Sequence, residues 1–458
     1  MNVFSGCLRW GVWGLLLLLG MGCRPAPTDS DRLPNIVLLV ADDLGYGDLS
    51  SYGHPTIHTP NLDRMAAEGL KLTSFYTPSP MCSPSRAALL TGRYPLRASV
   101  PHVLGPESAQ GLPPEELTMA ELLKPLGYRT ALFGKWHLGA QPGLLPTDQG
   151  FDEYLGLLYS NDMMPPWVQT ERPLALWHNT EPVEHPVDQS RLTVRYTAEA
   201  VRFIREQGDR PFFMQVAYAM PHVPLAVPAE RVGHSEGGLY GDVVETIDWS
   251  VGKILATLAE TGLDTHTLVI FTSDNGPWTN MPDRMFSEGL IQRWDAGTAG
   301  PLRGHKNSTY EGGVRVPGIL RWPGRIAPGR VSAALVATLD LFPTVAALTG
   351  APVPEGHLLD GYDLRAFLFD GAPSPRTTFA YERGQRLEAM REGRWKLRVD
   401  PDTGVAELFD LQVDPYELYN LAGDHPDQVA RLRALMQEHA SALGAVLTPV
   451  RVGPGPGG

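Results

Sequence analysis

The sequence predicts an α/β fold with a large, mostly parallel β-sheet, followed by a small C-terminal domain of antiparallel strands and one helix. Three apolar runs, residues 35–40, 211–219 and 267–272, are typical of strands buried on both faces of a parallel sheet. Segments with helical patterning lie between them, several ending at glycine. From about residue 376 the pattern changes to short strand candidates, which indicates the separate small domain.

The composition indicates a globular protein with a sizeable core. The chain has 458 residues, of which 43% are hydrophobic and 19% charged, enough for one large and one small domain. Its formal net charge of −13 at pH 7 argues against nucleic acid as a partner. An anionic substrate remains compatible with this charge where basic residues gather locally.

We expect residues 1–23 to form a secretory signal. Leu15–Leu19 lie in an apolar run that is too short to span a membrane comfortably. Cys23 and the unstructured residues 24–33 resemble a bacterial lipoprotein cleavage site and its tether, so the protein would be exported and held at a membrane only by a lipid on Cys23. The alternative is cleavage and release. We therefore expect a periplasmic, lipid-anchored cell-surface or secreted protein.

Oxygen-bearing side chains follow two of the buried strands. Asp42 and Asp43 follow the first run, and Asp274 and Asn275 follow the third. Open α/β sheets place their ligands at the carboxyl ends of strands, and an all-oxygen ligand set suits a hard divalent cation, above all Ca²⁺. The alternative for either pair alone is a solvated turn, where Asp is common.

Cys82 lies at the predicted start of a helix. Pro84 suits the first helical position and Gly92 suits the helix end, which places Cys82 just ahead of the helix and Arg86 one turn into it. Free N–H groups and a guanidinium at such an end suit a tetrahedral oxyanion. The alternative is a buried cysteine that acts as a small apolar residue, but the polar and proline neighbours favour chemistry.

Cys82 has no expected disulfide partner. The other two cysteines, Cys7 and Cys23, fall within the expected signal or at its end. An exported protein that keeps one unpaired thiol is unusual, and conversion of that thiol to another group would explain it.

Basic and polar residues follow other predicted strands or lie in loops. Lys135 and His137 are two residues apart between glycines, so an extended backbone would project both to one face. His222 follows the second apolar run between prolines, and Lys306 lies in the glycine-rich segment 300–317. Ser160 is a further candidate, for which an ordinary loop serine is the alternative.

The remaining elements complete the large domain. We expect helices over 59–69, 115–126, 193–207 and 240–261 and a strand over 128–133, while residues 71–76 return toward the Cys82 segment. Irregular loops that shape a substrate mouth are expected at 140–190 and 278–300. Residues 331–348 close this domain.

The small domain follows. Short strands are predicted at 378–381, 387–390, 395–399 and 406–410, with a helix over 428–443. We place the catalytic domain at 34–370, the small domain at 371–446 and a flexible tail at 447–458.

Several of these motifs together resemble a known family. The pattern Cys82-x-Pro84-x-Arg86 continues into Leu90-Thr91-Gly92-Arg93, and a tail motif begins at Glu407. Over residues 34–422 the chain resembles the type I, formylglycine-dependent sulfatases of the alkaline phosphatase superfamily, in particular those of the arylsulfatase A and galactosamine-6-sulfatase type. The resemblance implies a large mixed sheet between helices, with the site at the carboxyl edge of the strands.

The resemblance also implies the cofactors and the reaction. A formylglycine-generating enzyme would oxidise Cys82 to formylglycine, whose hydrate carries two hydroxyls on one carbon. The substrate would be a sulfate monoester on a small molecule or glycan. One Ca²⁺ would be held by the residue derived from Cys82 and by Asp42, Asp43, Asp274 and Asn275.

Residue roles in this hypothesis follow from charge and proton transfer. Ca²⁺, Arg86, Lys135 and Lys306 would neutralise the sulfate, and Asp274 would help one hydroxyl attack sulfur. His222, with Lys306, would assist departure of the alcohol. His137 would take the proton of the second hydroxyl as sulfate leaves. The substrate-binding residues would be Ser160, Lys135, His222 and Lys306.

Two alternatives remain at this point. A phosphodiesterase or phosphonate monoester hydrolase of the same superfamily would share the formylglycine. A non-catalytic glycan-binding protein would result if Cys82 stayed unmodified.

Overall fold

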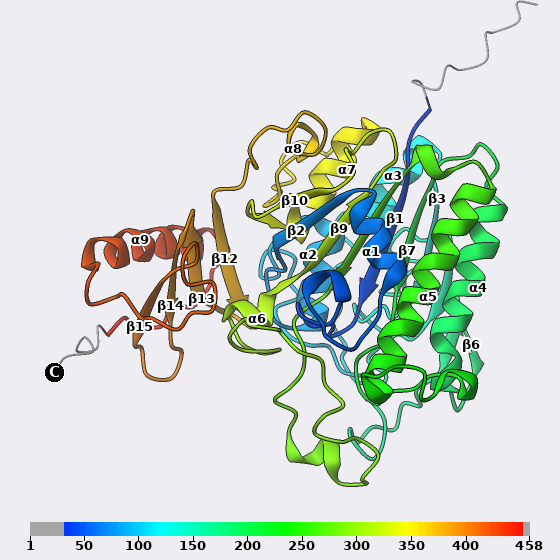
Figure 1. Ribbon diagram of the computed structural model, residues 1–458, viewed down its shortest axis with the longest axis horizontal. Coiled ribbons are helices and arrows are strands. Elements are labelled where there is room, and N and C mark those ends of the chain that lie inside the picture. The colour runs from blue at the N-terminus through cyan, green and yellow to red at the C-terminus, as the bar shows by residue number, and fades with distance from the viewer. Residues whose placement is uncertain (1–31, 452–458) are drawn as a thin grey trace, which may run out of the picture. The chain divides into compact units, whose positions relative to one another are not determined.

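The structure is a computed structural model that describes residues 32–451 (Figure 1). The expected signal with Cys7 and Cys23, most of the expected tether and the end of the expected tail lie outside the described residues. Within the described part of the chain, no helix is long and apolar enough to cross a membrane.

A mixed, eleven-stranded sheet forms the centre of the large α/β part. Its strand order is β10-β2-β9-β8-β1-β7-β3-β4-β5-β6, and β11 also pairs with β2. The strands are β1 Asn35–Ala41, β2 Leu70–Tyr76, β3 Arg129–Gly134, β4 Glu153–Gly156, β5 Leu176–His178, β6 Glu181–Glu184, β7 Phe212–Ala217, β8 Thr267–Ser273, β9 Arg315–Arg321, β10 Arg330–Ser332 and β11 Val336–Ala337.

The middle of the sheet is parallel and completely buried. β1 pairs in parallel with β8 on one side and with β7 on the other, and β7 pairs in parallel with β3. Every residue of β1, β7 and β8 is buried, which is why these segments are apolar without alternation. The expected fold class is thereby confirmed.

Helices lie on either side of this sheet (Figure 1). α1, α4 and α5 pack together, and α2, α3, α7 and α8 form a second group. The helices are α1 Pro60–Ala67, α2 Cys82–Thr91, α3 Met119–Leu123, α4 Leu192–Arg205, α5 Gly238–Glu260, α6 Glu311–Val314, α7 Leu341–Thr349, α8 Arg365–Phe369 and α9 Pro426–Leu443.

A four-stranded antiparallel sheet and α9 form the small part. The strand order is β12-β13-β14-β15, with bounds Thr378–Arg383, Arg386–Glu392, Trp395–Val399 and Ala406–Asp410. These four strands and α9 were all expected from the sequence. The domain boundary expected at residues 370 and 371 stays a prediction.

Three expectations about local structure were wrong. α2 begins at Cys82 with Met81 as its N-cap, so Cys82 is the first helical residue rather than the residue before the helix. The helix expected at 115–126 begins only at Met119, where Thr118 and Glu121 form a capping box, and it continues as a 3₁₀ turn over Lys124–Leu126. The first expected loop contains β4, β5 and β6, whose short, partly charged sequences lack an apolar run.

Candidate active site

Four adjacent strands end at one edge of the sheet and deliver most of the site. β8 leads to Asp274 and Asn275, β1 to Asp42 and Asp43, β7 to His222, and β3 to Lys135 and His137. Backbone bonds fix the strand exits relative to one another: Asp274 N donates to Ala41 O at 3.1 Å, and Lys135 N donates to Ala217 O at 2.7 Å. The strand exits therefore meet, as the parallel topology requires.

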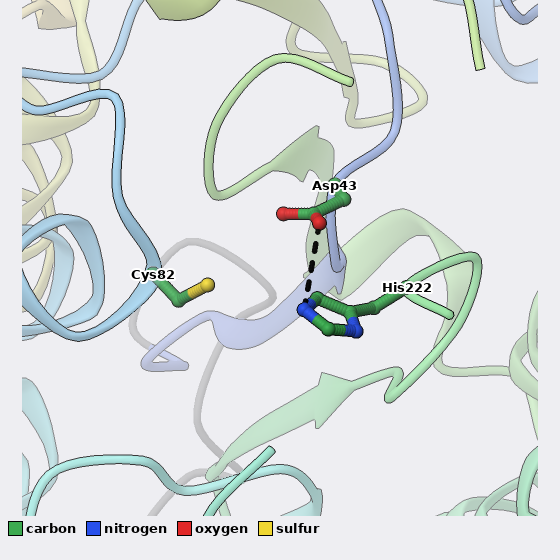
Figure 2. A group of neighbouring side chains, drawn as sticks. All are labelled: Asp43, Cys82 and His222. Atoms are coloured by element: carbon green, nitrogen blue, oxygen red, sulfur yellow. Dashed lines mark ion pairs between the residues drawn. The ribbon is translucent and has the colours of Figure 1, made fainter. Parts of the chain in front are cut away.

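Cys82 comes to this edge from the first turn of α2. Its side chain points toward Asp43 and His222 (Figure 2). Its Sγ lies within 4.8 Å of ligand atoms of both residues, and within the same distance of carboxylate oxygens of Asp42 and Asp274. Burial raises the pKa of the Cys82 thiol to about 12, so the thiol is protonated at neutral pH and is a weak nucleophile as it stands.

The first carboxylate, Asp42, is paired with two cations. Its Oδ2 accepts a hydrogen bond from Lys135 Nζ at 2.5 Å, and its Oδ1 lies 3.7 Å from an Arg86 nitrogen. Burial acts to raise the pKa of Asp42, but Lys135 and Arg86 outweigh it and hold the pKa below its ordinary value. Asp42 Oδ1 has no hydrogen-bond partner although it is buried.

Arg86 connects Asp274 to the end of β3. Its Nε donates to Asp274 Oδ2 at 2.9 Å, and another of its nitrogens donates to the backbone oxygen of Lys135 at 2.9 Å. Burial and the neighbouring Asp42 raise the pKa of Asp274. Arg86 thus fixes two strand exits with one rigid guanidinium.

Asp43 is the centre of a second group. Lys306 Nζ lies 2.8 Å from its Oδ1 and 2.9 Å from its Oδ2, and Asn275 Nδ2 donates to Oδ1 at 2.7 Å. Lys306 Nζ also lies 3.2 Å from Cys82 Sγ. Burial lowers the pKa of Lys306, but Asp43 and Cys82 outweigh it and the pKa is raised, so Lys306 carries its charge at neutral pH.

His222 joins these two groups through Ser160. Its Nδ1 is bonded to the Val223 carbonyl oxygen at 2.6 Å, which leaves Nε2 directed at Asp43 Oδ2 at 3.6 Å and at Ser160 Oγ at 3.4 Å. Lys135 Nζ donates to the same Ser160 hydroxyl at 3.1 Å. A carbonyl oxygen accepts only from an N–H, so Nδ1 of His222 carries a proton, and Nε2 is the nitrogen that faces the site.

The backbone conformation of His137 differs from the extended one that the sequence suggested. The residue has a φ of 60°, so it lies in the left-handed region and not in an extended segment beside Lys135. Its Nε2 is bonded to the Leu104 carbonyl oxygen at 2.8 Å, and its buried Nδ1 has no partner. Burial, Lys135 and Arg86 hold the pKa of His137 well below its usual range, so Nδ1 offers a lone pair at neutral pH.

The donor set fits a hard metal ion. Asp42 Oδ1 and Asn275 Oδ1 are both buried oxygens without a partner, and such atoms are costly unless something binds them. Three carboxylates (Asp42, Asp43 and Asp274) face three cations (Arg86, Lys135 and Lys306) across the ion pairs above. The side chains alone are therefore neutral as a group, and a bound divalent cation would make the site positive, as a sulfate-sized anion requires.

All eleven side chains expected at the site thus lie around this edge, and the structure adds residues that the sequence analysis missed. Trp278 is half-buried, with its ring 5.3 Å from the His222 ring and 4.8 Å from Lys306 Nζ. It lies in the second expected loop, three residues after Asn275. An aromatic residue so soon after a strand-end ligand was the available signal.

A buried ionic network joins the small sheet to the segment that carries Lys306. Lys396 of β14 is fully buried and lies 2.9 Å from Glu311 Oε1 of α6 and 2.8 Å from Glu417 Oε1. Glu311 also accepts a hydrogen bond from Tyr76 at 2.5 Å. The network holds α6, five residues beyond Lys306, and each member prevents burial of an unpaired charge.

Comparisons with known proteins agree with one another. A family model described as Sulfatase matches residues 34–351, and one described as N-sulphoglucosamine sulphohydrolase, C-terminal, matches residues 305–443. Human arylsulfatase A is 40% identical over 94% of this chain and 92% of its own length, and canine N-acetylgalactosamine-6-sulfatase is 39% identical over 90% of this chain and 80% of its own. The solved structure of the PsFucS1 sulfatase from Pseudoalteromonas sp. covers 90% of this chain and 91% of its own, with a TM-score of 0.80 and 30% identity.

Proposed function

The chain belongs to the sulfatase family and is a sulfuric ester hydrolase, and from this premise we propose that formylglycine made from Cys82, together with one Ca²⁺, carries out the hydrolysis. The observation that supports this most strongly is the position of Cys82 Sγ, which lies within 4.8 Å of carboxylate oxygens of Asp42, Asp43 and Asp274. A buried, protonated thiol is a poor catalyst there, whereas an oxygen nucleophile in the same place would suit both a hard metal and a sulfate ester.

Ca²⁺ would be held by Asp42, Asp43, Asp274, Asn275 and the residue derived from Cys82, and it would supply positive charge that polarises the ester. Formylglycine, once hydrated, would supply a nucleophilic oxygen and a second hydroxyl on the same carbon. A maturation enzyme of the formylglycine-generating type would make the group.

The chain's own side chains would bind and orient the sulfate. Lys135 Nζ donates to Asp42 and Lys306 Nζ donates to Asp43, and their ammonium groups would contact different sulfate oxygens. Ser160 lies between Lys135 and His222 and would donate a further hydrogen bond. Arg86 keeps Asp274 and the end of β3 in place through fixed bonds.

Two histidines would transfer protons, one through His222 Nε2 and the other through His137 Nδ1. His222 Nε2, with Lys306 nearby, would give its proton to the leaving alcohol. His137 Nδ1 has a free lone pair because Nε2 is bonded to Leu104, and it would accept the proton of the second hydroxyl. His222 Nε2 faces the Asp43 carboxylate, whereas His137 has the cations Lys135 and Arg86 as neighbours, so these surroundings suit His222 to the acid role and His137 to the base role.

The substrate would be an aryl or carbohydrate sulfate monoester. The names of the relatives, arylsulfatase A and N-acetylgalactosamine-6-sulfatase, refer to these two classes. We further propose that the protein is exported, with cleavage before Cys23 and a lipid on that cysteine, or else that residues 1–23 are removed and the protein is secreted.

The direct experiment is hydrolysis of 4-nitrocatechol sulfate by protein produced together with a formylglycine-generating enzyme. We expect turnover by the native chain and background rates for Cys82→Ala. A parallel assay with a phosphate diester separates this activity from that of a phosphodiesterase, which would prefer the diester. Full activity of Cys82→Ala would refute the proposed nucleophile.

A further inference from the structure

We propose that a basic cavity beside Cys82 binds a second anionic group of the substrate, so that the preferred substrate is a polyanionic oligosaccharide. This inference rests on the proposed sulfatase function and extends it to the substrate class. The cavity has a volume of about 490 Å³ and is lined by Met81, His102, Arg383, Gln385, Arg386 and Val446.

The cavity is lined by the residue that precedes the proposed nucleophile. Met81 lines it and is the N-cap of α2, and Cys82 is the next residue, so their Cα atoms are about 3.8 Å apart. The β12–β13 turn, which also lines the cavity, is fixed to the segment that precedes Met81, because Glu382 N donates to Pro78 O at 2.9 Å. A group attached to a sugar whose sulfate lies at Cys82 would therefore reach the cavity across Met81.

The segment that carries His102 is also fixed to α2. Two residues beyond His102, Leu104 N donates to Ser83 Oγ at 3.1 Å, and the Leu104 carbonyl oxygen bonds to His137. This wall is therefore tied both to the first turn of α2 and to a proposed catalytic residue. A ligand in the cavity would lie between two walls that are each bonded to the active site.

The charged side chains that line the cavity are all basic. Its lining contains two arginines and one histidine and no carboxylate, although the whole chain has a net charge of −13. Arg383 is paired with Glu388 at 2.7 Å, but Arg386 is exposed and donates only to Thr448 Oγ1 at 3.2 Å. Among the described residues Arg386 forms no ion pair, so its guanidinium is available for bidentate binding of a sulfate or carboxylate.

A neighbouring cavity shows that this charge is not a general property of the small sheet. That cavity has a volume of about 410 Å³ and shares Arg383, yet its lining also contains Glu388, Asp400 and Asp402. Its other two arginines, Arg303 and Arg398, are paired with Glu407. Carboxylates therefore compensate the positive charge there, and of these two cavities it is the one beside Met81 that keeps an arginine without an ion pair among the described residues.

The test compares Arg386→Gln with Arg205→Gln, a control on α4 at an arginine that is paired with Glu260 and is also exposed. The first readout is hydrolysis of 4-nitrocatechol sulfate, which has no second sugar to carry an anionic group into the cavity. We expect KM and kcat of both variants to stay within about twofold of the native chain, because this substrate does not depend on a charge-assisted contact between Arg386 and a second anionic group.

The second readout is equilibrium binding of a chondroitin 6-sulfate tetrasaccharide, measured by calorimetry on chains that also carry Cys82→Ala so that no turnover occurs. We expect Arg386→Gln to raise Kd about tenfold and to weaken its dependence on salt, since one charge-assisted contact is lost, while Arg205→Gln changes neither. An unsulfated chondroitin tetrasaccharide distinguishes carboxylate from sulfate as the bound group.

Two results would overturn the inference. One is an equal Kd for Arg386→Gln and Arg205→Gln, or no binding of either tetrasaccharide. The other is a loss of 4-nitrocatechol sulfate activity in Arg386→Gln as large as its loss of tetrasaccharide affinity. Failure of the sulfatase proposal itself would appear separately, as absent 4-nitrocatechol sulfate turnover by the matured native chain.

Discussion

Lys306 Nζ lies 3.2 Å from Cys82 Sγ, close enough to contact whatever group replaces that sulfur. The same ammonium lies against both oxygens of Asp43. In the proposed mechanism, Lys306 would therefore hold positive charge where the bond to the sulfur of the sulfate ester is made and broken. The predictions below follow from this arrangement and from the residues around it.

Replacing Lys306 with alanine should lower kcat for 4-nitrocatechol sulfate by about 10²–10³-fold, the usual cost of removing one electrostatic contact to a transition state. Lys124→Ala is the matched control, because Lys124 is 44% exposed and pairs only with Asp152. Circular dichroism should show the native fold in both variants. Equal activity in the two would contradict a catalytic role for Lys306.

The strand-end chemistry could be predicted because it is local in sequence. The apolar run predicts a buried strand, and the pair that follows it, Asp42–Asp43 or Asp274–Asn275, predicts which side chains lie at the end of that strand. The parallel topology then brings the two pairs together. Gly92, which takes the left-handed conformation that ends α2, could be predicted for a similar reason, since glycine adopts it without strain.

Other features depend on partners that are distant in sequence. β9 begins and ends with arginines, so it lacks an apolar signature, and it is buried only because Arg321 pairs with Glu68 and Asp264 and Arg315 with Glu311. Lys396 is buried beside Glu311, 85 residues away. No local pattern reveals such pairs, and none reveals that His137 turns to a positive φ.

Removing the metal should abolish activity and destabilise the fold. Asp42 Oδ1 and Asn275 Oδ1 would be left without a partner, and a ligand that binds only the folded state at 100 times its Kd contributes about 2.7 kcal/mol. We expect EGTA to lower both Tm and turnover, and added Ca²⁺ to restore both. Undiminished turnover in thoroughly chelated protein would remove Ca²⁺ from the mechanism.

Trp278 should determine how tightly the leaving group is held. Its ring lies beside His222 and Lys306, the two residues assigned to the departing alcohol. Trp278→Ala should raise KM for 4-nitrocatechol sulfate about tenfold through lost aromatic contact, and Trp278→Phe should recover most of it. Steady-state kinetics on both variants decides this, and an unchanged KM in the alanine variant would exclude the contact.

Stability should fall as pH rises because of Glu382. Burial raises the pKa of Glu382 from 4.5 to about 8, so between these pH values the folded state binds a proton that the unfolded state has released. The free energy of unfolding therefore decreases across this window. Glu382→Gln should stabilise the protein by on the order of a few kcal/mol at pH 8.5 and by little at pH 4.5.

Denaturant unfolding at the two pH values measures this effect. Glu438→Gln, at an exposed position on α9, serves as the control and should change neither value. If Glu382→Gln gave the same stability difference at both pH values, the carboxyl would not be protonated in the folded state.

The measurement that tests the central claim most directly is the mass of the tryptic peptide spanning residues 72–86 from active protein. We predict that this peptide is lighter than its sequence requires, because the CH2SH side chain of Cys82 has been replaced by an aldehyde. We also predict that an aldehyde-specific hydrazide labels the peptide. An unmodified Cys82 in preparations that hydrolyse sulfate esters at full rate would contradict the account.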